Sequence, residues 1–171
     1  MRLLTEARLT TRLNALHSAL KDLGIEHFRN PRWLCRTYSD EWPSNWRNHY
    51  PPPTGMVRRI ANTVTMADEI RERWGAPVKC LSGYRTPVYN DLLGQSAREH
   101  RGAEDSQHLY FRAMDLRPID GEIAGFRELT YEVVREWRAE GYFCGVGFYS
   151  SFCHIDIGRY SRQREWGMEY L

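Results

Sequence analysis

Two residues of metal-binding type stand close together in the middle of the chain. In the segment SQHLYFRAMDL, His108 precedes Asp115 by seven positions, with mostly bulky residues between them. A histidine nitrogen and a carboxylate oxygen are ordinary zinc ligands, and a second histidine would complete a set of three with a fourth position for water. Asp115 also has a simpler explanation, since Arg85 could pair with it or the carboxylate could cap a turn. The segment indicates either a metal site or a neutralised buried charge.

His154, in the segment FCHIDIG, is the candidate for the second histidine. Side chains alternate between the two faces of a strand, so Phe152, His154 and Asp156 share one face and the residues between them share the other. The second set is apolar and forms the natural core face, which turns His154 and Asp156 together toward a cleft or solvent. A histidine in such a place is, on its own, more often structural or exposed than a ligand. The histidines in helix or loop contexts without a matching acid are His17, His27, His49 and His100.

The composition is that of a single globular domain. The chain has 171 residues, of which 42% are hydrophobic and 27% charged, and this length can bury a core without disulfides. Its net charge of +2 is too small for a dedicated nucleic-acid binder, which concentrates basic residues on one face. No apolar run reaches the length of about 18 residues that a membrane span needs. We therefore expect no nucleic-acid partner, no membrane partner and a monomer.

The cysteines and the first twenty residues indicate in which cellular compartment the protein is expected. Four cysteines, Cys35, Cys80, Cys144 and Cys153, form neither a CxxC pair nor a zinc-finger spacing. Two of them lie in apolar runs, where cysteine packs as a small hydrophobe, so we interpret them as reduced structural thiols, with a disulfide as the alternative. The first twenty residues carry charge throughout and predict no secretory signal. The protein is expected to stay in the cell that makes it or to leave by another route.

Three helices are needed to position these residues. Leucines at steps of four and three predict an amphipathic helix over 9–23, ended by Gly24. Apolar periodicity predicts a second helix over 57–74, ended by Gly75, and a third from about 123 to 140.

The remaining segments predict short strands and loops. Residues 25–55 are rich in Trp, Tyr and Pro and indicate an ordered aromatic loop, while 91–107 resemble an irregular polar loop. VKCLS and AMDL read as short strands, and GVGFYSSFCHIDIG as two strands joined at a Ser-Ser turn. This order predicts an α+β fold with a small, largely antiparallel sheet flanked by helices. We expect residues 1–24 to form a helix packed on one domain that spans 25–171.

Three segments, in the order SGYRTPVYN, SQHLYFRAMDL and GVGFYSSFCHIDIG, resemble the zinc D-Ala-D-Ala carboxypeptidase and murein endopeptidase family. Its fold group includes lysostaphin-type and Hedgehog-type zinc domains. The family signature Ser-x-His-x-x-Gly-x-Ala-x-Asp is matched at Ser106, His108, Ala113 and Asp115. Matches in the flanking motifs are Ser82, Gly83, Tyr84, Arg85, Pro87, Asn90, Gly145, Gly147, Tyr149, Phe152, His154 and Asp156. The resemblance covers roughly residues 27–166, and three ordered motifs make a chance match rare.

The resemblance implies a zinc site with an arginine beside it. His108, Asp115 and His154 would hold one zinc ion and leave a fourth position for water, whose pKa zinc lowers to about 7. Arg85 would orient the substrate and stabilise the developing oxyanion, a role that suits a permanently charged, planar guanidinium. The residues assigned to substrate binding are Arg85, Tyr84 and Ser106.

Two positions depart from the family pattern. The acidic residue expected three positions before the last histidine is Ser151, which cannot act as a general base. Asp156 is then either the base or a group that orients a ligand or the arginine. The signature glycine is Phe111: the residue is strained if the position needs a positive φ, or its ring narrows the site or forms a substrate wall if glycine only leaves space.

The function implied by the resemblance is hydrolysis of amide bonds in peptidoglycan stem peptides or cross-links, by a D-Ala-D-Ala carboxypeptidase or a murein endopeptidase. The expected setting is a phage-type lysin, cytoplasmic until release to the cell wall; a virion-associated enzyme, or a periplasmic one with its leader removed, are the alternatives. The loop from Trp33 to Tyr50 would form a groove wall or pack in the core. The other classes are a non-catalytic zinc module that binds the wall or serves structure, and a metal-free assembly protein.

Overall fold

A computed structural model describes residues 6–35, 50–96, 105–158 and 163–171 of the chain. The α-helices are α1 (Glu6–Asp22), α2 (Ala61–Trp74), α3 (Pro87–Ser96) and α4 (Ile123–Ala139). The strands are β1 (Val78–Ser82), β2 (Ala113–Pro118), β3 (Cys144–Phe148), β4 (Cys153–Ile157) and β5 (Arg164–Trp166). Short 3-10 segments are η1 (Trp33–Cys35), η2 (Thr54–Ile60), η3 (Gln107–Tyr110) and η4 (Met168–Tyr170). The fold is α+β, as predicted.

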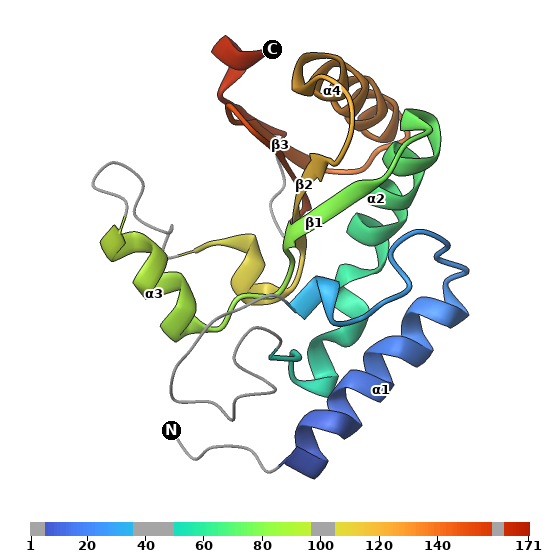
Figure 1. Ribbon diagram of the computed structural model, residues 1–171, viewed down its shortest axis with the longest axis vertical. Helices are drawn as coiled ribbons and strands as arrows, with labels where there is room; N and C mark the ends of the chain where they lie inside the picture. Colours follow the sequence, from blue (N-terminus) through green and yellow to red (C-terminus); the bar gives the residue numbers. More distant parts are fainter. Residues whose placement is uncertain (1–5, 36–49, 97–104, 159–162) are drawn as a thin grey trace.

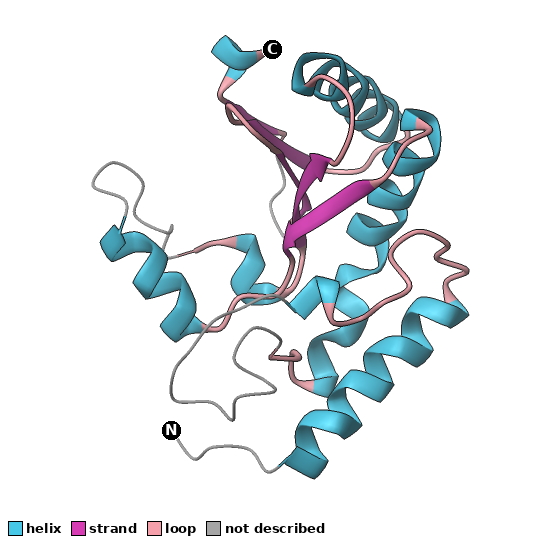
Figure 2. Ribbon diagram, in the orientation of Figure 1, coloured by secondary structure: helices cyan, strands magenta, loops and turns pink. Residues whose placement is uncertain are grey.

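The five strands form one sheet in the order β1-β2-β4-β3-β5, which lies at the centre of the molecule (Figure 2). Neighbouring strands pair antiparallel except β5, which runs parallel to β3. The small, largely antiparallel sheet is therefore confirmed. The edge strand β5 was not predicted.

One face of the sheet packs against α2 and α4 (Figure 1). The register places Met114, Ile155 and Val146 side by side across β2, β4 and β3, and all three are fully buried. Phe126 and Val133 of α4 are buried with them. Ile155 thus lies on the core face, as the alternation in β4 predicted, and the opposite face is left for other residues.

Helix α1 lies away from the sheet and packs against η2 (Figure 1). Leu9, Leu16 and Leu20 of its predicted stripe are buried. The helix ends where the sequence indicated, with Gly24 at a φ of +68°, a conformation that glycine adopts without steric cost. Gly75 ends α2 in the same left-handed conformation.

Helix α3 is a correction, because residues 91–96 were expected to be loop. Pro87 occupies the first turn, and the Thr86 hydroxyl accepts a hydrogen bond from the Tyr89 N–H at 3.2 Å. A threonine cap followed by proline at the first helical position is a standard start signal, and it was overlooked beside the polar residues that follow. Residues 97–104 of that predicted loop lie outside the described residues.

The predicted aromatic loop is described only at its ends. Trp33 is 46% exposed and Tyr50 is buried, while residues 36–49 lie outside the described residues. The groove-wall role of this loop therefore stays a prediction.

All four cysteines are free and buried, in agreement with the interpretation as structural thiols. Burial raises the pKa of Cys144 to about 11 and that of Cys153 to about 12, so these thiols stay protonated and unreactive at neutral pH. Among the described helices, none has the length and apolar character to cross a bilayer.

Candidate metal centre

A row of paired residues crosses the sheet on the face opposite the core. From β1 to β5 the row contains Ser82, Asp115, His154, Gly147 and Trp166. Residues directly opposite each other across a ladder share a face. A register shift in β1 between Cys80 and Ser82 brings Ser82 opposite Asp115, and bulges of this kind often re-aim a side chain next to a site.

His108 reaches this row from η3, the turn ahead of β2. Phe111 ends η3 with φ 54° and ψ 53°, and its N–H donates to the carbonyl of His108 at 3.2 Å. The chain then reverses into β2, so that His108 returns beside Asp115. The seven positions from His108 to Asp115 comprise the rest of this turn and the first residues of β2.

Three donor atoms converge at this point, and we call them the ligand triangle: Nε2 of His108, Nδ1 of His154 and Oδ1 of Asp115. The two nitrogens are 3.2 Å apart, Nε2 of His108 is 3.2 Å from Oδ1, and Nδ1 of His154 is 2.8 Å from Oδ1. All three side chains are buried. Two ligand atoms of a tetrahedral zinc ion are expected about 3.3 Å apart, given bonds of about 2.0–2.1 Å. The triangle therefore has the size of three corners of a zinc site.

The remaining ring nitrogens fix the tautomers of both histidines. Nδ1 of His108 lies 2.7 Å from the carbonyl oxygen of Gly83, and Nε2 of His154 lies 3.1 Å from Oδ2 of Asp156. Both partners only accept, so these nitrogens carry protons and the nitrogens of the triangle present lone pairs. Metal-binding histidines show this arrangement. Two lone pairs facing each other repel unless a cation lies between them, and the donor set fits zinc.

Without a cation, the site binds a proton at the same place. Burial opposes protonation of His154, but hydrogen bonds with Asp115 and Asp156 raise its pKa to about 9. Burial, together with the Arg85 guanidinium, lowers the pKa of His108 to about 4. Asp115 is also buried, yet His108 and His154 hold its pKa well below the usual range. The triangle thus combines one carboxylate with one positive charge at neutral pH.

Arg85 lies against the triangle with part of its guanidinium engaged. Its Nη2 donates to Oδ2 of Asp115 at 2.5 Å, and its Nε donates to the hydroxyl of Ser82 at 2.8 Å. Asp115 therefore forms the ion pair with Arg85 and also belongs to the triangle. The two interactions are compatible because the ion pair uses Oδ2 and the triangle uses Oδ1. Among the described residues, none accepts a hydrogen bond from Nη1 of Arg85.

The structure does not bring Tyr84 to the triangle. Its ring belongs to the hydrophobic core and is 6% exposed, and burial raises its pKa to about 12. The ring contacts Phe111 edge-on with centroids 6.0 Å apart. Ser106 precedes η3, is partly buried and makes no capping hydrogen bond.

Phe111 is the one non-glycine residue with a positive φ in the described part of the chain. This conformation costs a phenylalanine about 1–2 kcal/mol. Its ring is fully buried, which contributes about 1.5–3 kcal/mol of apolar stabilisation and offsets the strain. The first alternative for this position, a required positive φ, is therefore correct. The second, a substrate wall, is wrong, because a fully buried ring cannot touch a substrate.

Asp156 lies in the next row of the sheet, with Ala113, Gly145 and Arg164 as its neighbours. Besides the contact with His154, its Oδ1 accepts from Nη2 of Arg164 at 2.5 Å. The carboxylate is 1% exposed. His154 and Asp156 share a face, as predicted, but both side chains are buried there, and the side chains of Arg164 and Trp166 from β5 contact them.

Two glycines allow side chains of β5 to reach the site. A Cβ on Gly145 would overlap the carboxylate of Asp156 and lie 2.9 Å from Nη2 of Arg164, and a Cβ on Gly147 would overlap the indole of Trp166. Arg164 and Trp166 therefore cross β3 above its glycines. Sequence reasoning missed both residues. The available signal was that Gly-x-Gly and Arg-x-Trp have the same two-residue spacing, which is the period of one strand face.

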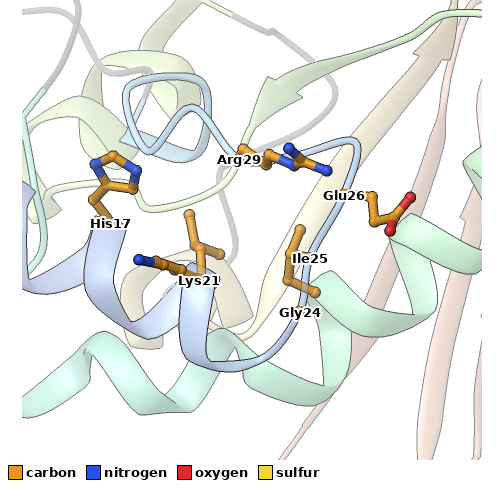
Figure 3. A pocket seen from close by; sticks show the side chains of 7 residues that line it. His17, Lys21, Gly24, Ile25, Glu26 and Arg29 are labelled. Atoms are coloured by element: carbon orange, nitrogen blue, oxygen red, sulfur yellow. The ribbon is translucent and has the colours of Figure 1, made fainter.

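A separate hollow lies at the C-terminal end of α1 (Figure 3). It has a volume of about 400 Å³ and is lined by His17, Leu20, Lys21, Gly24, Ile25, Glu26 and Arg29. None of the predicted site residues lines it. Its four ionisable side chains are exposed, where water and salt screen their charges. The chemistry that the sequence predicted therefore lies at the ligand triangle and not in this hollow.

The family model described as Peptidase M15 matches residues 43–156. The match contains all three residues of the triangle and ends at Asp156, so that α1 and β5 lie outside it. No curated protein matches the chain, and no solved structure does.

Proposed function

The chain belongs to the Peptidase M15 family of zinc peptidases, and on this premise we propose that it hydrolyses amide bonds in the peptide part of peptidoglycan. The observation that supports the proposal best is the ligand triangle, in which the other ring nitrogen of each histidine lies within hydrogen-bond distance of an acceptor. His108, Asp115 and His154 would hold a zinc ion, which would supply Lewis acidity and lower the pKa of a bound water.

In the proposed site, Asp156 orients His154. It accepts from Nε2 of His154 and is held in turn by Arg164. A general base must lie within hydrogen-bond reach of the proton that it removes. Both oxygens of Asp156 are already engaged and the side chain is buried, which favours the orienting role over the role of base.

Arg85 is the proposed contact for the substrate. Its Nη1, which has no acceptor in the part of the chain that the structure describes, belongs to a guanidinium that pairs with the buried Asp115. The peptides of the cell wall carry free carboxylates that a guanidinium binds well. Ser106 remains a further candidate for substrate binding.

The proposed setting is a phage-type lysin that reaches the cell wall after release from the cytoplasm. The modest positive net charge of +2 is compatible with an anionic polymer as substrate. Whether the enzyme removes terminal D-alanine or opens cross-links is decided by the products.

The test is mass spectrometry of purified peptidoglycan incubated with the protein, with and without a chelator. New stem-peptide fragments that vanish with the chelator and return with zinc are the expected result, whereas a His154→Ala variant should release none. His17→Ala, at an exposed position on α1, serves as the matched control and should act as the wild type. Loss of single D-alanine residues would identify a carboxypeptidase, and conversion of dimers to monomers an endopeptidase.

Two outcomes would contradict the proposal. Intact muropeptides from several wall types, with zinc bound to the protein, would favour the non-catalytic zinc module. A protein that holds no zinc at all would favour the metal-free class.

A further inference from the structure

Tyr149 follows β3 on the face of the sheet that carries the site. Its N–H donates to the carbonyl of Phe152 at 3.0 Å, and its ring stacks on that of Phe152 with centroids 4.2 Å apart and planes at 10°. Phe152 lies two residues before His154 in an extended segment, so their side chains share a face. The Tyr149 ring therefore lies next to the row that contains the ligand triangle.

Trp166 fixes the position of the Tyr149 hydroxyl. Its Nε1 donates to the hydroxyl oxygen at 3.0 Å, and its ring lies 5.1 Å from that of His154, centroid to centroid. An indole nitrogen can only donate, so the hydroxyl is the acceptor and its own proton points elsewhere. No residue in the described ranges accepts that proton. The Tyr149 hydroxyl is thus a donor held next to the ring that packs on His154, and no described residue uses its proton.

The hydroxyl keeps its proton at neutral pH. Burial raises the pKa of Tyr149 above its ordinary value, while the hydrogen bond from Trp166 opposes the change. The charges of Asp115 and Arg85 also act on Tyr149, which agrees with a position near both. Tyr149 is partly exposed, so a bound peptide can reach it.

The proposed reaction needs such a donor. Attack on an amide carbonyl places negative charge on its oxygen, and donors aimed at that oxygen usually make a large contribution to the rate. Arg85 was assigned this role, but its Nε and Nη2 already donate to Ser82 and Asp115. One free nitrogen is then left for both the substrate carboxylate and the oxyanion.

We propose that Tyr149 is a catalytic residue whose hydroxyl donates a hydrogen bond to the carbonyl oxygen of the scissile amide as charge develops there, and that Trp166 positions this hydroxyl. The inference rests on the proposed function, because it assigns a role in amide hydrolysis. It leaves Arg85 to bind the substrate. It also gives β5 a part in the site beyond its contact with Asp156.

The first test compares Tyr149→Phe with Tyr131→Phe. The Tyr131 hydroxyl donates to Glu165 at 3.3 Å and its ring packs on Phe148, on the helix side of the sheet, so its loss controls for removal of a tyrosine hydroxyl elsewhere. Tyr149→Phe is expected to lower kcat by about 10²- to 10³-fold with KM nearly unchanged. Tyr131→Phe should leave both unchanged. A raised KM with wild-type kcat would overturn the proposal, because the hydroxyl would then bind the ground state.

A second readout does not depend on turnover. A stem-peptide analogue with a tetrahedral phosphinate at the scissile position should bind Tyr149→Phe more weakly by the same factor as the loss of kcat/KM. Binding of the product peptide and of zinc should be unchanged. Equal phosphinate affinity of wild type and variant would overturn the role of Tyr149.

Trp166 is tested through a double-mutant cycle. Trp166→Phe keeps a ring against His154 but removes the Nε1 donor, and Tyr149→Phe should cost much less activity in this background than alone. Additive losses would contradict the positioning role. Wild-type protein that holds zinc but cleaves no wall peptide would overturn the proposed function together with this inference, whereas equal turnover by wild type and Tyr149→Phe would overturn the inference alone.

Discussion

At the scale of single residues, the surroundings of Asp156 support one of the two roles that the sequence left open, the orienting role that we propose. The carboxylate lies between the imidazole of His154 and the guanidinium of Arg164, with one oxygen directed to each. The hydrogen bonds and charges of His154 and Arg164 lower its pKa, although burial opposes this. It is therefore an ionised acceptor that holds His154 in one tautomer. Each carboxylate oxygen is already engaged by one of these partners, which supports the orienting role.

The variant Asp156→Asn separates the two roles. An amide cannot accept from both His154 and Arg164, so zinc affinity should fall by about 10- to 100-fold, while turnover at saturating zinc should stay within about tenfold of wild type. Competition with a chromogenic chelator measures the affinity. Asp120→Asn, at an exposed turn, is the control and should change neither quantity. Unchanged zinc affinity with a loss of turnover of 10² or more would instead identify Asp156 as the general base.

Sequence reasoning led to the three residues of the triangle through the resemblance of three ordered motifs to a family of zinc peptidases. The residue types and their spacing alone left the choice open between a metal site and a paired carboxylate. It could not predict the contact of Arg164 with Asp156, which depends on a strand paired to the far side of β3. Tyr84 was misplaced for a related reason. It adjoins Arg85 in the motif, but neighbouring residues in a turn have no common face, and its ring entered the core.

At the scale of elements, the hairpin of β3 and β4 works together with β5. Because the glycines of β3 have no side chains, Arg164 and Trp166 can lie across the strand. Glycine normally weakens a strand interior, so its presence here twice, at alternate positions, indicates a packing requirement. Three residues of β5 thereby complete a site whose ligands lie on other elements.

Gly147→Ala should disrupt this arrangement. The added Cβ would overlap the indole of Trp166, and we expect a loss of about 1–3 kcal/mol in the free energy of unfolding, as for other overpacked positions. Urea denaturation measures the change. Gly55→Ala is the matched control, because nothing lies within 4 Å of its added Cβ, and it should stay within about 0.5 kcal/mol of wild type. Equal stability of the two variants would show that Trp166 does not lie over Gly147.

The longer elements could be predicted and the shorter ones could not. Helices α1, α2 and α4 show apolar periodicity over several turns, which is the strongest local signal in a sequence. Helix α3 has a start signal in Thr86 and Pro87 but polar residues after it. Strand β5 has three residues, none of which is buried, and a strand this short gives too few positions for an apolar alternation in the sequence.

At the scale of the whole molecule, the sheet divides two kinds of environment. One face packs on α2 and α4 and is mostly apolar, whereas the other holds buried ionisable side chains. Charges removed from water are costly unless they are paired, and each of these has a partner: Asp115 with Arg85, and Asp156 with Arg164. In the ligand triangle the two histidine nitrogens face each other. A metal ion between them would accept the lone pairs of both.

Zinc should therefore stabilise the folded protein as a whole. At a free zinc concentration of 100 times Kd, binding adds about 2.7 kcal/mol, which corresponds to a rise in Tm of about 5–10 °C for a chain of this size. Calorimetry with zinc and with a chelator measures the difference. The His154→Ala variant should show no zinc-dependent shift, and His17→Ala should show the full one. An identical Tm of the wild type under both conditions would contradict zinc binding at the triangle.

Because β5 follows the other described strands in the sequence, the residues of the site are synthesised in a fixed order. A ribosome releases the chain from its N-terminus at about 5–20 residues per second, so His108 and Asp115 emerge seconds before Arg164 and Trp166. Until β5 is translated, His154 lacks the arginine that holds its carboxylate partner, and β3 presents two bare glycines. The growing chain thus carries all three metal ligands before it carries the two β5 residues that contact His154 and its carboxylate partner.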